Sequence, residues 1–211
     1  TIASGSMDKT VRLWNAANAK PLCSLIGHTE WVMSVAWRCD GEVIASGSAD
    51  ETVRIWDLTG RELAVLEGHT SYVCSVAWHP MAPILATGSF DGTVRVWDVH
   101  SGKSSATLEG HTDYVRSVAW HPEGRMLASG SIDGTIRLWD VATSKAISII
   151  DQFADMVAWH PNGKVLASSS SGESPIRLWE PKTGKLIAIL PGHPGHVLSI
   201  AWRPDGKCLA S

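Results

Sequence analysis

The chain has 211 residues, and its hydrophobic fraction of 44% is enough for a sizeable buried core. Its 18 basic and 21 acidic side chains give a formal charge of −3, which argues against a general binder of nucleic-acid backbones. No apolar run is long enough for a membrane span, and the start carries no signal-peptide pattern. The four cysteines lack the spacing of a zinc site or disulfide framework, which favours free thiols and an intracellular, cytoplasmic location.

Tryptophan is unusually frequent, with 11 residues against two Tyr and two Phe. Ten of them form two series that recur about every 42 residues, in phase with Gly-His pairs. Such self-similarity is typical of repeat architectures. The first series is Trp14, Trp56, Trp97, Trp139 and Trp179; the second is Trp37, Trp78, Trp120, Trp159 and Trp202; the pairs end at His28, His69, His111 and His193.

One unit predicts four short strands. A Val-rich alternating run is the first, and His79-Pro80 ends it. Asp91-Gly92 predicts a tight hairpin between the second and third strands, because glycine tolerates positive φ. No long segment shows uninterrupted helical periodicity, so the chain is predicted to be all-β. The expected strands are 72–78, 84–89, 93–97 and 104–108.

Side-chain size differs systematically between strands. The second strands are built from small residues, as in Ile44–Ser48, Leu85–Ser89 and Leu127–Ser131, whereas third strands such as Val53–Trp56 are bulky. Sheets that radiate from an axis lie close together inside and farther apart outside. Small inner and large outer side chains fill such wedges, so the gradient favours a β-propeller over a flat solenoid.

The repeated pattern Gly-His, Val-x-x-Val-Ala-Trp, Leu-Ala-Ser-Gly-Ser and Asp-Gly-Thr-Val-Arg-x-Trp-Asp resembles the WD-repeat (WD40) β-propeller family. The resemblance covers essentially the whole chain. It implies four-stranded antiparallel blades, usually closed into a ring of seven, and a role as a protein-interaction platform. The expected units are a partial blade 1–28, repeats at about 29–69, 70–111, 112–150 and 151–193, and a partial blade 194–211.

Two ring closures are compatible with about five repeats. In one, the strand at 197–202 joins the first strands of the chain and closes a five-bladed ring. In the other, the chain is a segment of a larger, seven-bladed propeller. An open arc would leave unpaired edges, so we expect self-association or blades supplied by a parent or partner chain.

The family resemblance also implies a hydrogen-bonded His–Ser/Thr–Asp–Trp set within each blade. At the ends of the chain, Asp8 with Trp14 and His193 with Ser211 are expected to be the two halves of another set. The complete sets are His28, Ser46, Asp50 and Trp56; His69, Thr87, Asp91 and Trp97; and His111, Ser129, Asp133 and Trp139.

Taken singly, Ser, His and Asp suggest a catalytic triad, but these residues recur in every unit, whereas a nucleophile needs one exposed site with an oxyanion hole. We therefore predict structural networks and no catalytic residue, metal or cofactor. The Arg two positions before each first-series Trp is expected to cover the indole. His79, His121 and His160 are interpreted as turn residues before Pro; the alternative is a ring that binds an anion or a metal.

The unit 151–180 departs most from the repeat. Its Gly-His is replaced by Asp151-Gln152 in a shortened connection, and its Asp-Gly turn by the longer segment 170–175. Both changes fall on one face, so the unit is either a decayed blade or a tailored docking site. Its polar network is expected to be incomplete.

The same face carries variable, often large apolar residues at equivalent positions, as binding patches do. The sequence therefore predicts a non-catalytic scaffold or sensor that binds a protein or peptide here. Channel-mouth catalysis or small-ligand binding, and nucleic-acid reading, are the alternatives. The candidate partner-binding residues are Trp31, Met33, Tyr72, Phe90, Tyr114, Arg116, Ile132 and His196.

Overall fold

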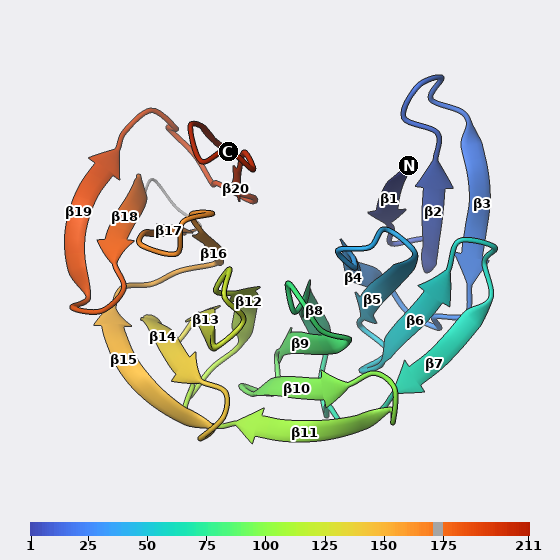
Figure 1. Ribbon diagram of the computed structural model, residues 1–211, viewed down its shortest axis with the longest axis horizontal. Coiled ribbons are helices and arrows are strands. Elements are labelled where there is room, and N and C mark those ends of the chain that lie inside the picture. Colours follow the sequence, from blue (N-terminus) through green and yellow to red (C-terminus); the bar gives the residue numbers. More distant parts are fainter. Residues whose placement is uncertain (171–174) are drawn as a thin grey trace.

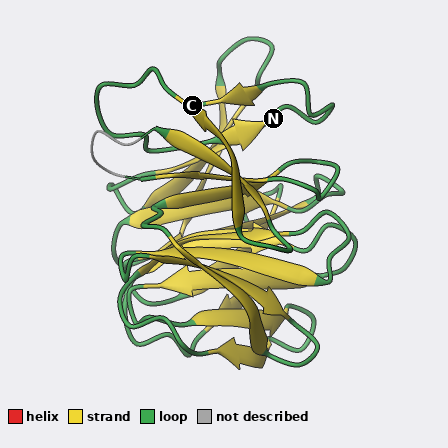
Figure 2. Ribbon diagram, turned by 90° about the vertical axis from the view of Figure 1, so that its left-hand side faces the viewer, coloured by secondary structure: helices red, strands yellow, loops and turns green. Residues whose placement is uncertain are grey.

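The computed structural model describes residues 1–170 and 175–211, and this part of the chain contains strands and no helix. Figure 2 shows strands crossing the molecule and loops gathered on two opposite faces. The strands are β1 (Ile2–Gly5), β2 (Thr10–Trp14), β3 (Pro21–Ile26), β4 (Val32–Trp37), β5 (Val43–Ser48), β6 (Val53–Asp57), β7 (Glu62–Leu66), β8 (Val73–Trp78), β9 (Ile84–Ser89), β10 (Val94–Asp98), β11 (Lys103–Leu108), β12 (Val115–Trp120), β13 (Met126–Ser131), β14 (Thr135–Asp140), β15 (Lys145–Asp151), β16 (Met156–Trp159), β17 (Leu166–Ser169), β18 (Ile176–Glu180), β19 (Lys185–Leu190), β20 (Ala201–Trp202) and β21 (Leu209–Ala210).

Consecutive strands pair antiparallel and form separate sheets. Four sheets have four strands each, namely β4–β7, β8–β11, β12–β15 and β16–β19, while β1–β3 and β20–β21 form smaller ones. Figure 1 shows the sheets side by side around an axis, with the first strand of each complete sheet nearest the axis and the fourth on the rim. The predicted all-β propeller of four-stranded blades is confirmed.

The two ends of the chain lie on either side of an opening in the ring (Figure 1). The sheets β1–β3 and β20–β21 are separate, so the self-closed five-bladed ring is not what this structure shows. The last segment instead packs on the preceding sheet, where Val197 and Ile200 share a core cluster with Ala167 and Ile176. The structure is an open arc.

The core lies between the sheets. Ala45, Ala86 and Ala128 in the second strands are fully buried because both faces of these strands are covered. Each cluster joins the apolar residues of one sheet to the tryptophan of the next; Trp97, for example, packs with Val53 and other residues of β4–β7. The gradient from small inner to large outer side chains thus fills the wedge between sheets.

Three histidines join neighbouring sheets on one face. Each Nε2 donates a hydrogen bond to a glycine carbonyl in the next sheet, and each Nδ1 accepts one from a backbone N–H two residues later. They are therefore more than turn residues. Because both ring nitrogens are used, they are poorly placed to bind an anion or a metal. The contacts are His79 to Gly124 at 3.1 Å, His121 to Gly163 at 3.2 Å and His160 to Gly206 at 3.1 Å.

The first prediction concerns the contact between His79 and Gly124. A Cβ at Gly124 would lie 2.1 Å from His79 Nε2, and its φ of +74° already disfavours alanine. Gly41 has the same turn position and a φ of +73°, with nothing near its Cβ. We expect Gly124→Ala to lower the free energy of unfolding by about 2–4 kcal/mol and Gly41→Ala by about 1 kcal/mol.

Urea denaturation of both variants measures this difference. In a His79→Ala background the additional cost of Gly124→Ala should shrink, because the clash and the hydrogen bond are both removed. Equal costs for the two glycines would show that the contact between sheets contributes nothing.

Candidate functional site

The first strands β4, β8 and β12 begin on the same face of the arc as the turns between the second and third strands. Backbone hydrogen bonds join the two, with Ala49 N–H bound to Trp31 O at 2.9 Å and Phe90 N–H to Tyr72 O at 2.9 Å. We call this side, defined by Trp31, Tyr72 and Tyr114 at the starts of the strands, the first-strand face. The contacts between His and Gly lie on the opposite face.

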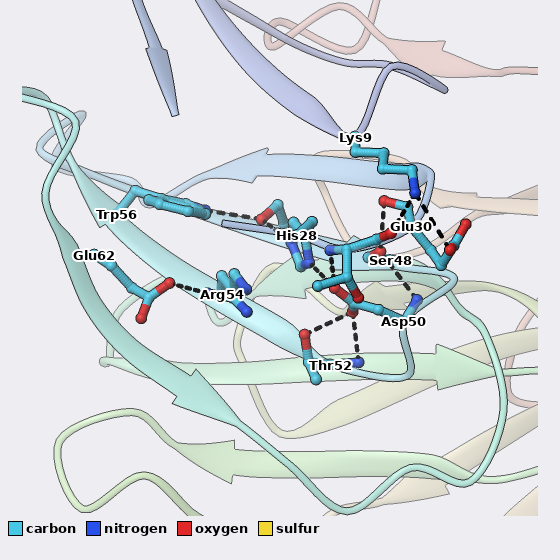
Figure 3. A network of polar contacts seen from close by, with 11 residues as sticks. Lys9, His28, Glu30, Ser48, Asp50, Thr52, Arg54, Trp56 and Glu62 are labelled. Atoms are coloured by element: carbon cyan, nitrogen blue, oxygen red, sulfur yellow. Dashed lines mark hydrogen bonds and ion pairs between the residues drawn. The ribbon is translucent and has the colours of Figure 1, made fainter. Parts of the chain in front are cut away.

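A buried polar network underlies this face in each of three sheets. In the first, His28 Nδ1 lies 2.8 Å from Asp50 Oδ2 and His28 Nε2 lies 2.7 Å from Ser46 Oγ. Trp56 Nε1 donates to Ser46 Oγ at 2.8 Å. Figure 3 shows His28, Asp50 and Trp56 of this set with their surroundings. The sets His69–Thr87–Asp91–Trp97 and His111–Ser129–Asp133–Trp139 repeat these contacts at 2.7–2.9 Å.

Each network forms a chain of donors with one direction. The indole N–H donates to the hydroxyl, so the hydroxyl proton points to His Nε2, and His Nδ1–H donates to the carboxylate. This chain requires a neutral imidazole. Burial lowers the pKa of His28 and His111 accordingly. The Ser or Thr hydroxyl accepts a hydrogen bond from the indole and donates one to the histidine, so none of these sets presents a free nucleophile.

The carboxylate of each network is held ionised. Burial raises the pKa of Asp50, but hydrogen bonds from the Thr52 hydroxyl, the Thr29 backbone N–H and the His28 ring outweigh burial and hold the pKa at about 2. The pKa of Asp133 is also about 2, for the same kind of reasons. Each carboxylate thereby anchors both the turn and the start of the neighbouring first strand.

Partial sets occur at the two ends. Trp14 Nε1 donates to Ser4 Oγ at 2.8 Å, while Asp8 accepts from Thr10 and Arg12. His193 Nε2 lies 2.6 Å from Ser211 Oγ, and both residues are exposed. The structure thus brings His193 and Ser211 together. Asp8 and Trp14 belong to one hairpin but contact different residues.

The sheet β16–β19 retains only part of the network. Trp179 Nε1 donates to Ser168 Oγ at 2.8 Å, and no histidine approaches Ser168 among the described residues. Most of the lengthened turn predicted at 170–175 lies outside the described residues. The shortened connection places Asp155 at the position that Arg116 holds in the preceding sheet, since each lies two residues before the valine that bonds to the neighbouring sheet.

Three aromatic rings form a stack on the first-strand face. Phe90 lies between Tyr72, at a centroid distance of 5.6 Å, and Tyr114, at 4.3 Å and an interplanar angle of 8°. The Arg116 guanidinium lies 5.7 Å from the Phe90 ring and its Nε lies 3.4 Å from Asp155 Oδ1. We call Tyr72, Phe90, Tyr114 and Arg116 the aromatic row. It crosses the junction between the sheets β8–β11 and β12–β15.

The aromatic row is accessible, because Tyr72 and Tyr114 each keep more than two fifths of their surface exposed. Trp31 and Met33, at the start of β4, are similarly exposed. Ile132 is half-buried, and His196 is exposed near the end of the chain. The structure thus brings four of the predicted partner-binding candidates together in the row. The sequence analysis missed Asp155, because the shortened connection before it breaks the alignment with the other repeats.

Other repeated groups are structural. Arg95 and Arg137 lie 5.9 Å from the rings of Trp97 and Trp139, as expected for arginines that cover the indole.

Burial raises the pKa of the Cys74 thiol to about 12, and its Sγ donates to Val115 O at 2.8 Å. Cys74 is therefore a neutral, unreactive thiol at the edge of the row.

A family model described as "WD domain, G-beta repeat" matches residues 1–15, 19–57, 60–98, 102–140 and 184–211, more than half of the chain. The chain belongs to the WD40 repeat family. Members generally act as platforms that bind other proteins and are generally not enzymes. The stretch between the last two matches contains the first three strands, β16–β18, of the sheet that lacks a network histidine. No helix of the described residues is long and apolar enough to cross a membrane.

Curated relatives match over about one repeat. "Ribosome assembly protein 4" is 42% identical over 43 residues in both Chaetomium thermophilum and Saccharomyces cerevisiae, covering 20% of this chain and 8% of those proteins. The "WD40 repeat-containing protein HOS15" of Arabidopsis thaliana is 52% identical over 44 residues, covering 21% of this chain and 7% of that protein. The match thus spans less than a tenth of each relative, and it supports the repeat rather than a particular partner.

The second prediction compares two serines. Ser46→Ala removes the partner of both the Trp56 indole and the His28 ring, and we expect it to lower the free energy of unfolding by about 2–3 kcal/mol. Ser168→Ala removes the partner of the Trp179 indole alone and should cost about 1 kcal/mol. Chemical denaturation of the two variants checks this; a loss at Ser168 as large as at Ser46 would contradict the network energetics.

The third prediction concerns pH. His28 and His111 have folded-state pKa values below their unfolded value, so their contribution is complete above about pH 6.5 and declines as the pH falls further. Asp50 and Asp133, with pKa values of about 2, add a contribution that is lost between about pH 4 and pH 2. Stability measured by urea denaturation should therefore fall from pH 7.5 to pH 5.5 and again below pH 4. A constant or rising stability between pH 7.5 and pH 5.5 would argue that the histidines are not buried neutral.

Proposed function

We propose that this chain is a non-catalytic interaction module that binds a peptide or a partner domain on the first-strand face. The observation that carries the proposal is the exposed aromatic row, in which Arg116 is oriented by a buried carboxylate from the next sheet. Rigid aromatic side chains beside an arginine supply large contact area at low entropic cost, and these residue types dominate interface energetics.

The row also has the geometry of a binding anchor. Phe90 is held on both sides by tyrosines, so the surface is ordered before a partner arrives and little is lost on binding. Trp31 and Met33 extend the apolar surface into the neighbouring sheet on the same face. A partner that spans the three sheets β4–β7, β8–β11 and β12–β15 would therefore meet five large side chains and one guanidinium.

Non-catalytic function is supported by the state of the Ser–His–Asp groups. Their hydroxyls are buried and bonded at both ends, and the same arrangement recurs in three sheets. Within residues 1–170 and 175–211, no group of three or more His, Cys, Asp or Glu side chains could hold a metal ion. Acidic net charge makes a nucleic-acid partner the weaker alternative.

The fourth prediction tests the face. A random peptide library displayed on phage is selected against the chain, and the enriched peptides are synthesised and measured by fluorescence anisotropy. We expect Tyr114→Ala and Phe90→Ala to weaken their binding by about tenfold or more. Met81→Ala is the matched control, because Met81 is 69% exposed on the opposite face.

Peptides that bind the Tyr114→Ala and Met81→Ala variants equally well would overturn the assignment of this face. Circular dichroism and thermal denaturation of each variant establish that the arc is intact before binding is compared.

A further inference from the structure

Charge is distributed unevenly between the two faces of the arc. The first-strand face consists of the connections into the first strands, the starts of those strands and the turns between second and third strands. Within residues 1–170 and 175–211 it holds 11 acidic side chains and two basic ones, Lys9 and Arg116. The loops and strand ends of the opposite face hold nine acidic and 11 basic side chains. The formal charge of −3 for the whole chain therefore conceals one strongly negative face.

Six acidic side chains of this face are exposed to solvent. Glu30 pairs with Lys9 at 3.3 Å, and none of the other five forms an ion pair with another described residue. Carboxylates without a cation of their own are available to pair with the cations of a partner. The six are Glu30, Glu51, Glu67, Glu109, Asp113 and Asp151.

The buried networks add to the negative charge of the face. Asp50 and Asp133 stay ionised, with pKa values of about 2, while burial keeps His28 and His111 neutral beside them. The histidines therefore do not cancel the charge of the carboxylates. Salt screens partly buried charges less than exposed ones, so their field reaches the surface above them.

Two of the exposed carboxylates lie at the two ends of the aromatic row. Asp113 precedes Tyr114 and accepts a hydrogen bond from the Tyr114 backbone N–H at 2.7 Å. Glu51 has the place in its turn that Gly92 has in the next sheet. A Cβ at Gly92 would lie 3.6 Å from Asp113 O, in the connection that leads to Tyr114. By the same repeat, Glu51 lies beside the connection that leads to Tyr72.

From these features we infer that the occupant of the aromatic row is a lysine- or arginine-rich segment of a partner protein. The inference rests on the proposed function, because it names the chemistry of the partner at the same face. Long basic side chains suit this surface, since their stems pack on aromatic rings while their charged ends reach the carboxylates. Complementary charge favours such a segment over acidic peptides and nucleic acids, which the face repels.

Arg116 divides the surface into positions of different preference. Its guanidinium lies 5.7 Å from the centre of the Phe90 ring, in the middle of the row, and disfavours a second cation there. The carboxylates of Glu51 and Asp113 favour cations at the two ends. The surface therefore fits an apolar residue flanked on both sides by lysine or arginine.

The experiment uses the random peptide library displayed on phage. Enriched peptides that lose binding to the Tyr114→Ala variant are the probes, and we expect them to be basic, with an apolar residue between lysines or arginines. Fluorescence anisotropy should show their affinity for the wild-type chain falling about tenfold or more between about 0.05 M and about 0.5 M salt. The same peptides with glutamine in place of each basic residue should bind at least about tenfold more weakly.

Two matched variants locate the charges that matter. Glu51→Gln/Asp113→Asn removes two carboxylates beside the row, keeps a side-chain oxygen for the Tyr114 N–H, and should weaken binding about fivefold or more. Glu42→Gln/Glu123→Gln removes the same charge from exposed residues on the opposite face and should leave the affinity unchanged. Circular dichroism and thermal denaturation verify that both variants are folded.

Neutral or acidic peptides that depend on Tyr114, or an affinity that does not change with salt, overturn the inference and leave the proposed function intact. Equal weakening by the two double variants also overturns it, because the effect would then come from the charge of the whole chain. A selection that yields no peptide dependent on Tyr114 overturns the proposed function itself and this inference with it. The two failures are therefore distinguishable.

Discussion

The second strand of each complete sheet is covered on both faces by neighbouring sheets, and the rest of the structure depends on this constraint. Its residues must be small, as Ala45 and Ala86 are, and any hydroxyl there must find a partner within the protein. For Ser46 the partners are the Trp56 indole and the His28 ring. The histidine comes from the connection that precedes this sheet, so satisfying one buried hydroxyl also fixes where the first strand of the same sheet begins.

Opposite ends of each junction are held by different contacts. On the first-strand face, the network aspartates hold the turns and the strand starts; on the other face, His79, His121 and His160 bond to the following sheet. Each of these histidines is matched by a glycine at the turn of the next sheet that accepts its hydrogen bond. Where Arg38 replaces the histidine, the next sheet has Ala82 at the glycine position, and Arg38 lies instead 5.8 Å from the Trp78 ring. Each pair of neighbouring sheets is therefore joined on this face by its own pair of contacting residues.

The repeat makes the blade predictable and hides the contacts between blades. Strand order, hairpin turns and the wedge of side-chain sizes follow from periodicity, because every unit solves the same packing problem. The contact of His79 with Gly124 joins residues 45 positions apart in different sheets, and no single repeat contains both. The ion pair of Arg116 with Asp155 escaped prediction for the same reason, since the shortened connection before Asp155 breaks the alignment of the units. Ring closure is likewise a property of all blades together, which explains why the repeat pattern left two alternatives.

The sheet β16–β19 shows what a blade can lose. Without a network histidine it still keeps the bond from Trp179 to Ser168, and it still meets its neighbours through His121 and His160. In place of the lost contact it contributes Asp155, whose side chain is largely buried and bonded to Arg116. A decayed blade would be expected to lose its network without gaining a buried charge, because burying a carboxylate costs free energy unless a partner offsets it. This sheet lacks the network histidine and has gained a buried carboxylate that orients an exposed arginine, which favours a blade adapted to the proposed binding face over one in decay.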